Sequence, residues 1–239
     1  MPEPTPLMLE SFEQLAKHRR SIRHFDPRAV ADELLMRLLD CARWAPSGYN
    51  LQPTHFVLVS DLAIKMRLFT ACMSQRQIVE APTIVVFVGD RRAFQHNAEA
   101  MLAQERAAES ISPEYETLLR RVLPLAFSHA PAGLGWLWKA LLIPVAAIFR
   151  PVPSIPAVHQ RFWLAKQVAL AAMNFMLAAE AAGLATVPME GFDERRVRRL
   201  LGIPRWCIVP IIVPVGYAAD RPAGKTRLPL AGMTHRDRW

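Results

Sequence analysis

Residues 160–182 constrain the fold of this chain most, because they predict a long helix that is apolar on nearly every side. The segment is rich in alanine, and Gly183 follows it as a C-terminal stop. A helix without a polar face has to lie in a hydrophobic core or at a subunit interface. Hydrophobic residues make up 52% of the 239-residue chain, so a core large enough to enclose such a helix is expected.

Three further segments predict strands. Residues 83–89 are a continuous β-branched run, which is typical of a strand buried on both faces of a sheet. Residues 55–60 alternate loosely between polar and apolar side chains and predict a second strand. Residues 207–217 predict a last strand, in which Pro210 and Pro214 indicate a sheet edge or a bulge.

Shorter helices are predicted on both sides of these strands. Residues 12–20 predict a short helix, and residues 32–44 predict an amphipathic one because leucines recur there at helical spacing. Asp193 predicts the N-cap of a later helix. No repeat or clear linker interrupts the sequence, so residues 1–239 are predicted to form a single domain.

The net charge of +8 could indicate binding to a nucleic acid, to an anionic membrane surface or to an anionic cofactor. The basic residues are dispersed apart from a run at 195–199, and neither zinc-finger spacing nor an RNA-binding signature accompanies them. Nucleic acid is therefore not expected as a partner. The histidines show no metal-ligand spacing, so no metal site is expected either.

The cysteines indicate the redox compartment. Cys41, Cys72 and Cys207 stand far apart and include no Cys-x-x-Cys pair, which is typical of small buried thiols in a reducing compartment. Residues 1–10 hold neither a basic n-region nor a long apolar stretch, unlike a signal peptide. A cytoplasmic location is therefore predicted.

Residues 128–156 are unusually apolar. Its most apolar part, residues 132–149, is slightly short for a spanning helix, which needs about 20 apolar residues, and Lys139 and Pro144 interrupt it. Four interpretations stay open: an excursion packed on the body or across a dimer, a lid over a substrate, shallow contact with a membrane, and a true span. On a helix, Trp136 and Trp138 would point about 200° apart, so one of them could contact a substrate.

Two groups of basic residues, far apart in sequence, could together clamp an anion. Arg19, Ser21 and Arg23 alternate, so an extended backbone would place their side chains on one face. Lys225 and Arg227 have the same spacing, and chain termini often lie close together. Taken alone, the first group is more typical of a solvated basic helix end, and the second of an ordinary polar tail.

Two turn segments offer polar groups to a planar ligand. Residues 46–50 follow a helix, and Asn50 and Gln52 each carry a donor and an acceptor. Residues 188–193 precede a helix, whose entrance presents oriented backbone N–H groups. An ordinary loop is the plain alternative for both. The sequence contains no Rossmann fingerprint, P-loop or Gly-x-Ser-x-Gly elbow, so no dedicated nucleotide fold is expected.

Together these segments resemble the FMN-dependent nitroreductase family. The resemblance rests on Arg-Arg-Ser-Ile-Arg-x-Phe from Arg19, Ala-Pro-Ser-Gly-x-Asn-x-Gln-Pro from Ala45, Gly-Leu-x-Thr-x-Pro-Met-Glu-Gly-Phe-Asp from Gly183, and Lys-x-Arg-Leu from Lys225. It covers residues 12–94 and 160–230. It implies an α+β nitroreductase fold, with a central, mostly antiparallel sheet flanked by helices. It also implies an intertwined homodimer with two FMN sites at the interface.

The resemblance implies a role for each matching residue. Arg19, Lys225 and Arg227 would hold the FMN phosphate, while Ser21 would contact the ribityl chain and Arg23 the pyrimidine edge of the ring. The remaining implied cofactor-binding residues are Arg20, Pro188, Met189, Glu190 and Gly191, then Pro46, Ser47, Gly48 and Asn50 from the other subunit, and Ser74 and Gln77 as a weaker match. Glu190 and Gly191 would lie beside N5 of the ring.

The implied activity is FMN-dependent oxidation of NAD(P)H, with reduction of a small-molecule electron acceptor such as a nitroaromatic or a quinone by a ping-pong hydride mechanism. No side chain is assigned as a catalytic acid or base, because the flavin carries the chemistry. Two alternatives stay open. One is other flavin chemistry on the same fold, namely reductive dehalogenation or ring oxidation, and the other is a membrane-docked flavin-binding protein with little turnover.

Residues 95–159 depart from a compact family member, because they are longer and more apolar. In the family, this region borders the entrance for substrate. It is therefore expected to be a variable insertion or lid, in which Trp136 and Trp138 are the candidate substrate contacts and residues 128–156 the candidate peripheral membrane contact.

Overall fold

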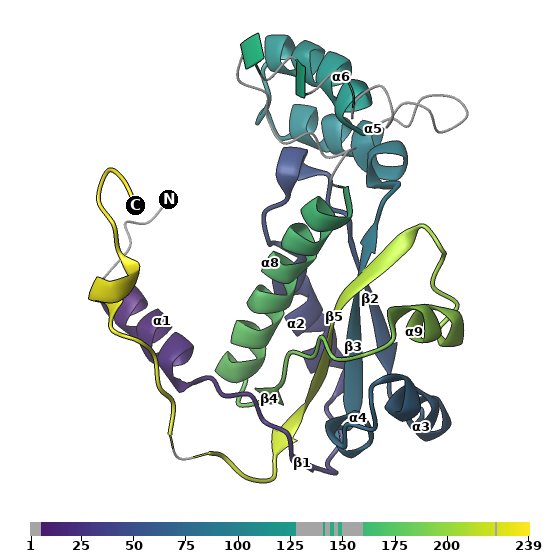
Figure 1. Ribbon diagram of the computed structural model, residues 1–239, viewed down its shortest axis with the longest axis vertical. Helices are drawn as coiled ribbons and strands as arrows, with labels where there is room; N and C mark the ends of the chain where they lie inside the picture. The colour runs from purple at the N-terminus through teal and green to yellow at the C-terminus, as the bar shows by residue number, and fades with distance from the viewer. Residues whose placement is uncertain (1–5, 128–140, 142–143, 146–147, 150–159, 223) are drawn as a thin grey trace.

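A five-stranded sheet forms the centre of the computed structural model, and its named strands pair in antiparallel fashion (Figure 1). The strands are β1 (Phe25–Asp26), β2 (Thr54–Val59), β3 (Thr83–Asp90), β4 (Ala185–Thr186) and β5 (Cys207–Ala218). Their order is β1-β5-β3-β2, and β4 also pairs with β5. The structure describes residues 6–127, 141, 144, 145, 148, 149, 160–222 and 224–239.

Helices lie on both faces of this sheet. They are α1 (Pro6–His18), α2 (Asp32–Arg43), α3 (Leu62–Ala71), α4 (Gln77–Glu80), α5 (Ala93–Ala107), α6 (Pro113–Phe127), α8 (Gln160–Ala181) and α9 (Glu194–Leu200), with short 3-10 turns η1 (Gly48–Asn50) and η3 (Leu230–Met233). The α+β class and the mostly antiparallel sheet are as predicted.

At Pro214, strand β5 lies inside the sheet between β3 and the segment of β4, so the expected sheet edge is wrong at that proline. It pairs with β3 on one side, and residues 215–218 pair with β1 and β4 on the other side. At Pro210 the alternative, a bulge, is borne out, because the register of β3 and β5 shifts between Phe87 and Gly89, opposite that residue, whereas Pro214 pairs in register with Ile84. A proline has no N–H to donate, and a bulge is a place where the ladder needs none.

Helix α8 combines a core face with an apolar outer face. Leu164, Val168 and Phe175 are fully buried against the sheet and α2. Phe162 and Leu170 remain exposed, at 67% and 45%. Within the described part of the chain, α8 is also the helix whose length and composition would suit a membrane span. Its packing against β3, β5 and α2 places it in the core of the protein instead.

The other face of the sheet is covered by α3, α4 and α9. Leu68, Ile78 and Val197 from these helices are fully buried there. Asp193 caps α9 as predicted, since its carboxylate accepts a hydrogen bond from the backbone N–H of Arg196 at 3.1 Å.

Two of the three cysteines are buried thiols as predicted, but the third is exposed, so the prediction is wrong for that residue. Burial raises the pKa of Cys72 to about 12 and is the main cause that raises the pKa of Cys207 to about 11, so both stay protonated at neutral pH. Cys41 is exposed, because it lies on the outer side of α2 while Leu38 and Ala42 face the core.

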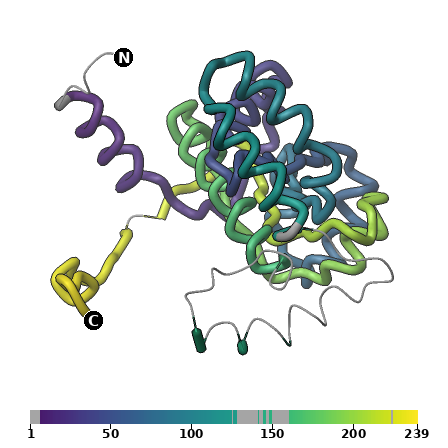
Figure 2. The backbone as a smooth tube through the Cα atoms, turned by 90° about the horizontal axis from the view of Figure 1, so that it is seen from above, coloured from purple at the N-terminus to yellow at the C-terminus, as the bar shows by residue number. Residues whose placement is uncertain are grey.

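Helix α1 and the segment after β5 extend away from the body, as both views show (Figures 1 and 2). Helix α1 begins at Pro6, earlier than the predicted Phe12, because proline is well suited to a first helical turn. Both arms carry exposed apolar side chains: Leu7, Met8, Leu9 and Phe12 on α1, and Leu228, Leu230, Met233 and Trp239 on the C-terminal segment.

Helices α5 and α6 form a separate layer above the 46–52 loop (Figure 1). Leu51 from that loop is fully buried among their side chains, and the Phe127 ring meets the Trp163 ring at 5.0 Å. Most of the apolar stretch 128–156 lies outside the described residues, including both candidate substrate tryptophans, Trp136 and Trp138.

Candidate functional site

The segment after α1 runs extended along β4. Ser21 forms a parallel bridge with Thr186, and the Ile22 N–H donates to the Thr186 carbonyl at 3.1 Å. Ile22 is buried, so the alternation of side chains leaves Ser21 half-buried and Arg23 exposed on the other side. The predicted extended arrangement of this basic group is therefore present.

Lys225 docks onto the end of α1. Its Nζ donates to the carbonyls of Ala16 at 2.8 Å, Lys17 at 3.2 Å and Arg19 at 3.0 Å. These carbonyls include orphan acceptors of the last helical turn, which a lysine satisfies well. The two basic groups, far apart in sequence, thus meet in space, as the clamp hypothesis requires.

Four cations, Arg19, Arg20, Lys225 and Arg227, influence one another at this meeting point. Burial is the main cause that lowers the pKa of Arg19, which Glu180 opposes and Arg227 reinforces. The pKa of Lys225 is lowered by burial first, and then by Arg227, Arg19 and Arg20. A bound anion would relieve this mutual repulsion.

The same cluster holds unused donors. Arg19 Nη1 and Arg20 Nε are buried and have no hydrogen-bond partner among the described residues. Buried guanidinium nitrogens normally find acceptors, and a phosphate with several oxygens matches them well. The residues present therefore fit a phosphate-bearing ligand such as FMN. We call Arg19, Lys225 and Arg227 the clamp.

A second polar group lies further along the β4–β5 edge. Residues 186–191 run alongside β5, and Met189 and Ile212 exchange backbone hydrogen bonds of 2.8 and 3.0 Å there. Gln75 Nε2 donates to the Gly191 carbonyl at 2.8 Å, and Gln77 Nε2 donates to Gln75 Oε1 at 3.0 Å. The structure thus places the predicted Gln77 close to the predicted Gly191.

Gln75 is the residue that sequence reasoning missed in this group. It is the direct link between Gln77 and Gly191, and its neighbour Ser74 has a positive φ of 54°. In the sequence, the available signal was the pair of amide side chains at 75 and 77. Glu190 is exposed beside this group, whereas Met189 is buried and contributes backbone only.

The loop of residues 46–52 is held tightly at the other end of α8. The Gly48 N–H donates to Gln167 Oε1 at 2.8 Å, and the Gln52 N–H donates to Ser47 Oγ at 2.9 Å. Asn50 Nδ2 donates to Glu105 Oε1 at 2.5 Å. Residues 49, 50 and 52 have φ of 58°, 50° and 47°, a strained conformation that is common at functional sites.

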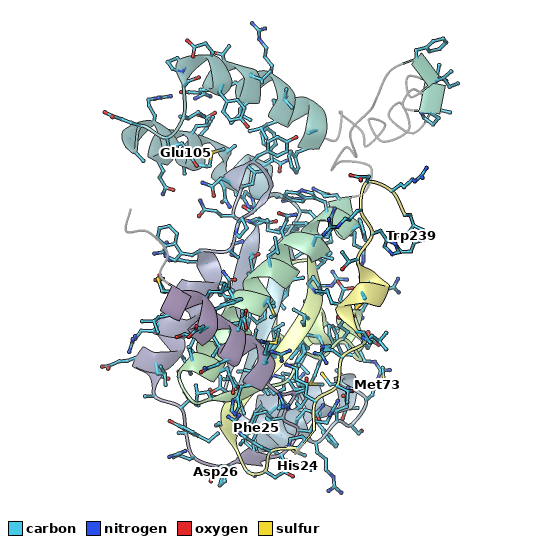
Figure 3. All side chains as sticks on the ribbon, turned by 90° about the vertical axis from the view of Figure 1, so that its left-hand side faces the viewer. His24, Phe25, Asp26, Met73, Glu105 and Trp239 are labelled. Atoms are coloured by element: carbon cyan, nitrogen blue, oxygen red, sulfur yellow. The ribbon has the colours of Figure 1, made fainter. Side chains whose placement is uncertain are left out.

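A single chain does not bring this loop to the clamp. Gly48 contacts α8 at Gln167, whereas the clamp lies near Glu180, and at 1.5 Å per residue this separation along α8 is about 20 Å. Figure 3 shows the same distribution, with Glu105 at one end of the molecule and His24 and Phe25, which follow the clamp segment, at the other. Pro46, Ser47, Gly48 and Asn50 therefore form a second, separate group.

Comparison with known proteins identifies the architecture. A family model described as "Nitroreductase family" matches residues 16–217. The chain belongs to the nitroreductase family. This membership confirms the predicted resemblance, the nitroreductase fold class and the assignment as an oxidoreductase.

Relatives of this nitroreductase-family chain carry consistent names. A "NADH dehydrogenase" of Thermus thermophilus is 33% identical, over 90% of this chain and 90% of that protein. An "Oxygen-insensitive NAD(P)H nitroreductase" of Salmonella typhimurium is 29% identical, over 90% of this chain and 94% of that protein. A nitroreductase-like protein of Streptococcus mutans has the same fold, with a TM-score of 0.75 and 22% identity over 95% of this chain and 98% of that chain.

One solved neighbour bears on the cofactor. It is a nitroreductase candidate from Exiguobacterium sibiricum in complex with FMN, with a TM-score of 0.71 and 22% identity over 94% of this chain and 96% of that chain. The predicted FMN and NAD(P)H agree with this description and with the names of the relatives. Among the described residues, no cluster suited to a metal ion is found.

Proposed function

We propose that this nitroreductase-family chain is an FMN-dependent NAD(P)H oxidoreductase that reduces electron-poor acceptors such as nitroaromatics and quinones. The observation that carries the proposal is the clamp, with its crowded cations and the unpartnered donors of Arg19 and Arg20. When bound, FMN supplies the redox chemistry, taking hydride from NAD(P)H and passing electrons to the acceptor in a ping-pong cycle.

The protein's own residues bind and orient the cofactor. Arg19, Lys225 and Arg227 hold the phosphate, and Ser21 contacts the ribityl chain. The exposed Arg23 lies two residues further along the same strand-like segment, where its charge would stabilise negative charge on the pyrimidine edge of the ring. The Gln75 side chain donates to the Gly191 carbonyl and so orients the backbone that would lie beside the reactive edge of the ring.

The acceptor and cofactor assignments are tested together on purified protein. We expect visible flavin absorption, and steady NAD(P)H oxidation when menadione or a nitroaromatic is added. If FMN added to the purified protein does not bind, the proposal fails. If FMN binds but neither acceptor supports turnover, a flavin-binding protein with little turnover, or other flavin chemistry, replaces the proposed reaction.

We also propose a homodimer in which the 46–52 loop of one subunit completes the FMN site of the other. The loop lies about 20 Å along α8 from the clamp of its own chain, so a second copy is needed to bring the two together. The exposed apolar side chains of α1, of the C-terminal segment and of the outer face of α8 supply a surface for that copy.

FMN-loaded protein is expected to sediment as a dimer at micromolar concentration, because each site needs two chains. A flavin-loaded monomer would contradict the shared site. Subunit mixing gives a sharper test. A dimer that combines Arg227→Ala in one subunit with Asn50→Ala in the other would keep one unaltered site if the loop crosses over. If each chain builds its own site, the mixed dimer keeps none.

A further inference from the structure

A buried carboxylate lies beneath the clamp. Glu180 sits in the last turn of α8, and its side chain is only 4% exposed. Glu180 Oε1 is 2.6 Å from His18 Nδ1 and 3.0 Å from Arg221 Nη1. A buried carboxylate is costly unless it is paired and hydrogen-bonded, so these contacts are needed to keep it there.

The two partners of Glu180 come from the two chain segments that carry the clamp. His18 is the last residue of α1 and precedes Arg19 directly. Arg221 follows β5 and leads to Lys225 and Arg227. Both segments otherwise extend away from the body (Figure 2). A single carboxylate on the rigid core helix therefore ties both arms to the same point.

The charge of Glu180 also acts on the clamp directly. It raises the pKa of Arg19, against the effects of burial and of Arg227. This attraction offsets part of the repulsion among the clamp cations before any ligand is bound. The same negative charge would repel a phosphate through space, although the ion pair with Arg221 reduces that repulsion.

We propose that Glu180 is a positioning residue for the phosphate clamp, which holds α1 and the C-terminal segment so that Arg19, Lys225 and Arg227 face one phosphate. This inference rests on the proposed function. The tethering effect favours phosphate binding and the through-space effect opposes it. When the charge of Glu180 is removed, weaker FMN binding shows that tethering dominates, and tighter FMN binding shows that repulsion dominates.

The test is Glu180→Gln, measured as dissociation constants of the apoprotein for FMN and for riboflavin. Riboflavin has the same ring and polyol chain but no phosphate, so it does not depend on the clamp. We expect FMN binding to weaken about tenfold, comparable to the loss of one charged hydrogen bond, while riboflavin binding stays unchanged. The matched control is Gln14→Ala, since Gln14 and Glu180 both line an open pocket of about 700 Å³ between α1 and α8. It should leave both constants unchanged.

Each outcome decides the matter. Equal weakening for FMN and riboflavin would mean a general structural role and would overturn the inference, as would tighter FMN binding. If Glu180→Gln does not fold, Arg221→Gln keeps the carboxylate and should weaken FMN selectively; no selective loss then overturns the inference. Arg227→Ala tests the clamp separately: equal effects on FMN and riboflavin binding would mean that the clamp assignment is wrong, whereas the proposed function fails only if the unaltered protein does not bind FMN.

Discussion

Replacement of Arg227 by alanine is expected to weaken FMN binding about tenfold or more. The change removes a charge-assisted contact to the phosphate, worth roughly 1.5–3 kcal/mol, and each 1.4 kcal/mol corresponds to about a factor of ten in affinity. Arg227 is exposed, so its loss should leave the fold intact. Fluorescence titration of the apoprotein with FMN measures the effect.

A control must separate the clamp from overall charge. Arg195→Ala on α9 removes the same charge from an exposed position outside the clamp, and it should leave FMN affinity nearly unchanged. Equal losses in the two variants would mean that net positive charge, rather than a defined phosphate site, attracts the cofactor. Unchanged FMN affinity in Arg227→Ala would count against the clamp.

Replacement of Phe87 by alanine is expected to lower the free energy of unfolding by about 3–5 kcal/mol. Phe87 is fully buried on β3, where its ring meets those of Phe56 at 5.4 Å and Phe175 at 5.6 Å. Truncation would leave a cavity between the sheet and α8. For a chain of this size, each kcal/mol shifts the melting temperature by roughly 2–4 °C.

Thermal unfolding of the apoprotein at fixed concentration measures this loss. Met66→Ala is the matched control, because Met66 is 52% exposed on α3 and alanine is a good helix former. It should change stability by no more than about 0.5 kcal/mol. A loss below about 1 kcal/mol in Phe87→Ala would mean that the aromatic cluster collapses to fill the space.

The parts of the fold that were predicted correctly are those that local pattern determines. Strand β3 and helix α8 follow from uninterrupted apolar runs, which have to be buried whatever surrounds them. The placement of β5 depends on which distant strands pair with it, and proline content alone could not distinguish an edge from a bulge inside the sheet. Cys41 was misplaced because exposure on α2 depends on which helical face meets the core.

The clamp could be anticipated because both of its halves carry local charge at alternating spacing. Gln75 and Glu180 could not be assigned in the same way, since their roles depend on segments far away in sequence. A partial signal for Glu180 exists, because it is the sole acidic residue within Gln160–Ala181, and a charge on an apolar helix is seldom buried without a partner. Whether the assigned residues bind FMN stays a prediction.

The interior position of β5 has a consequence for how the protein is made. The strand begins at Cys207, so during synthesis the antiparallel pair of β2 and β3 can form before β5, the strand that pairs with the free edge of β3, has been translated. An unpaired apolar edge is an aggregation hazard, and pairing between such distant segments slows folding. Because Lys225 and Arg227 follow β5, a nascent chain that has not closed its sheet also lacks half of the clamp. Binding of FMN would then indicate that β5 has joined the sheet.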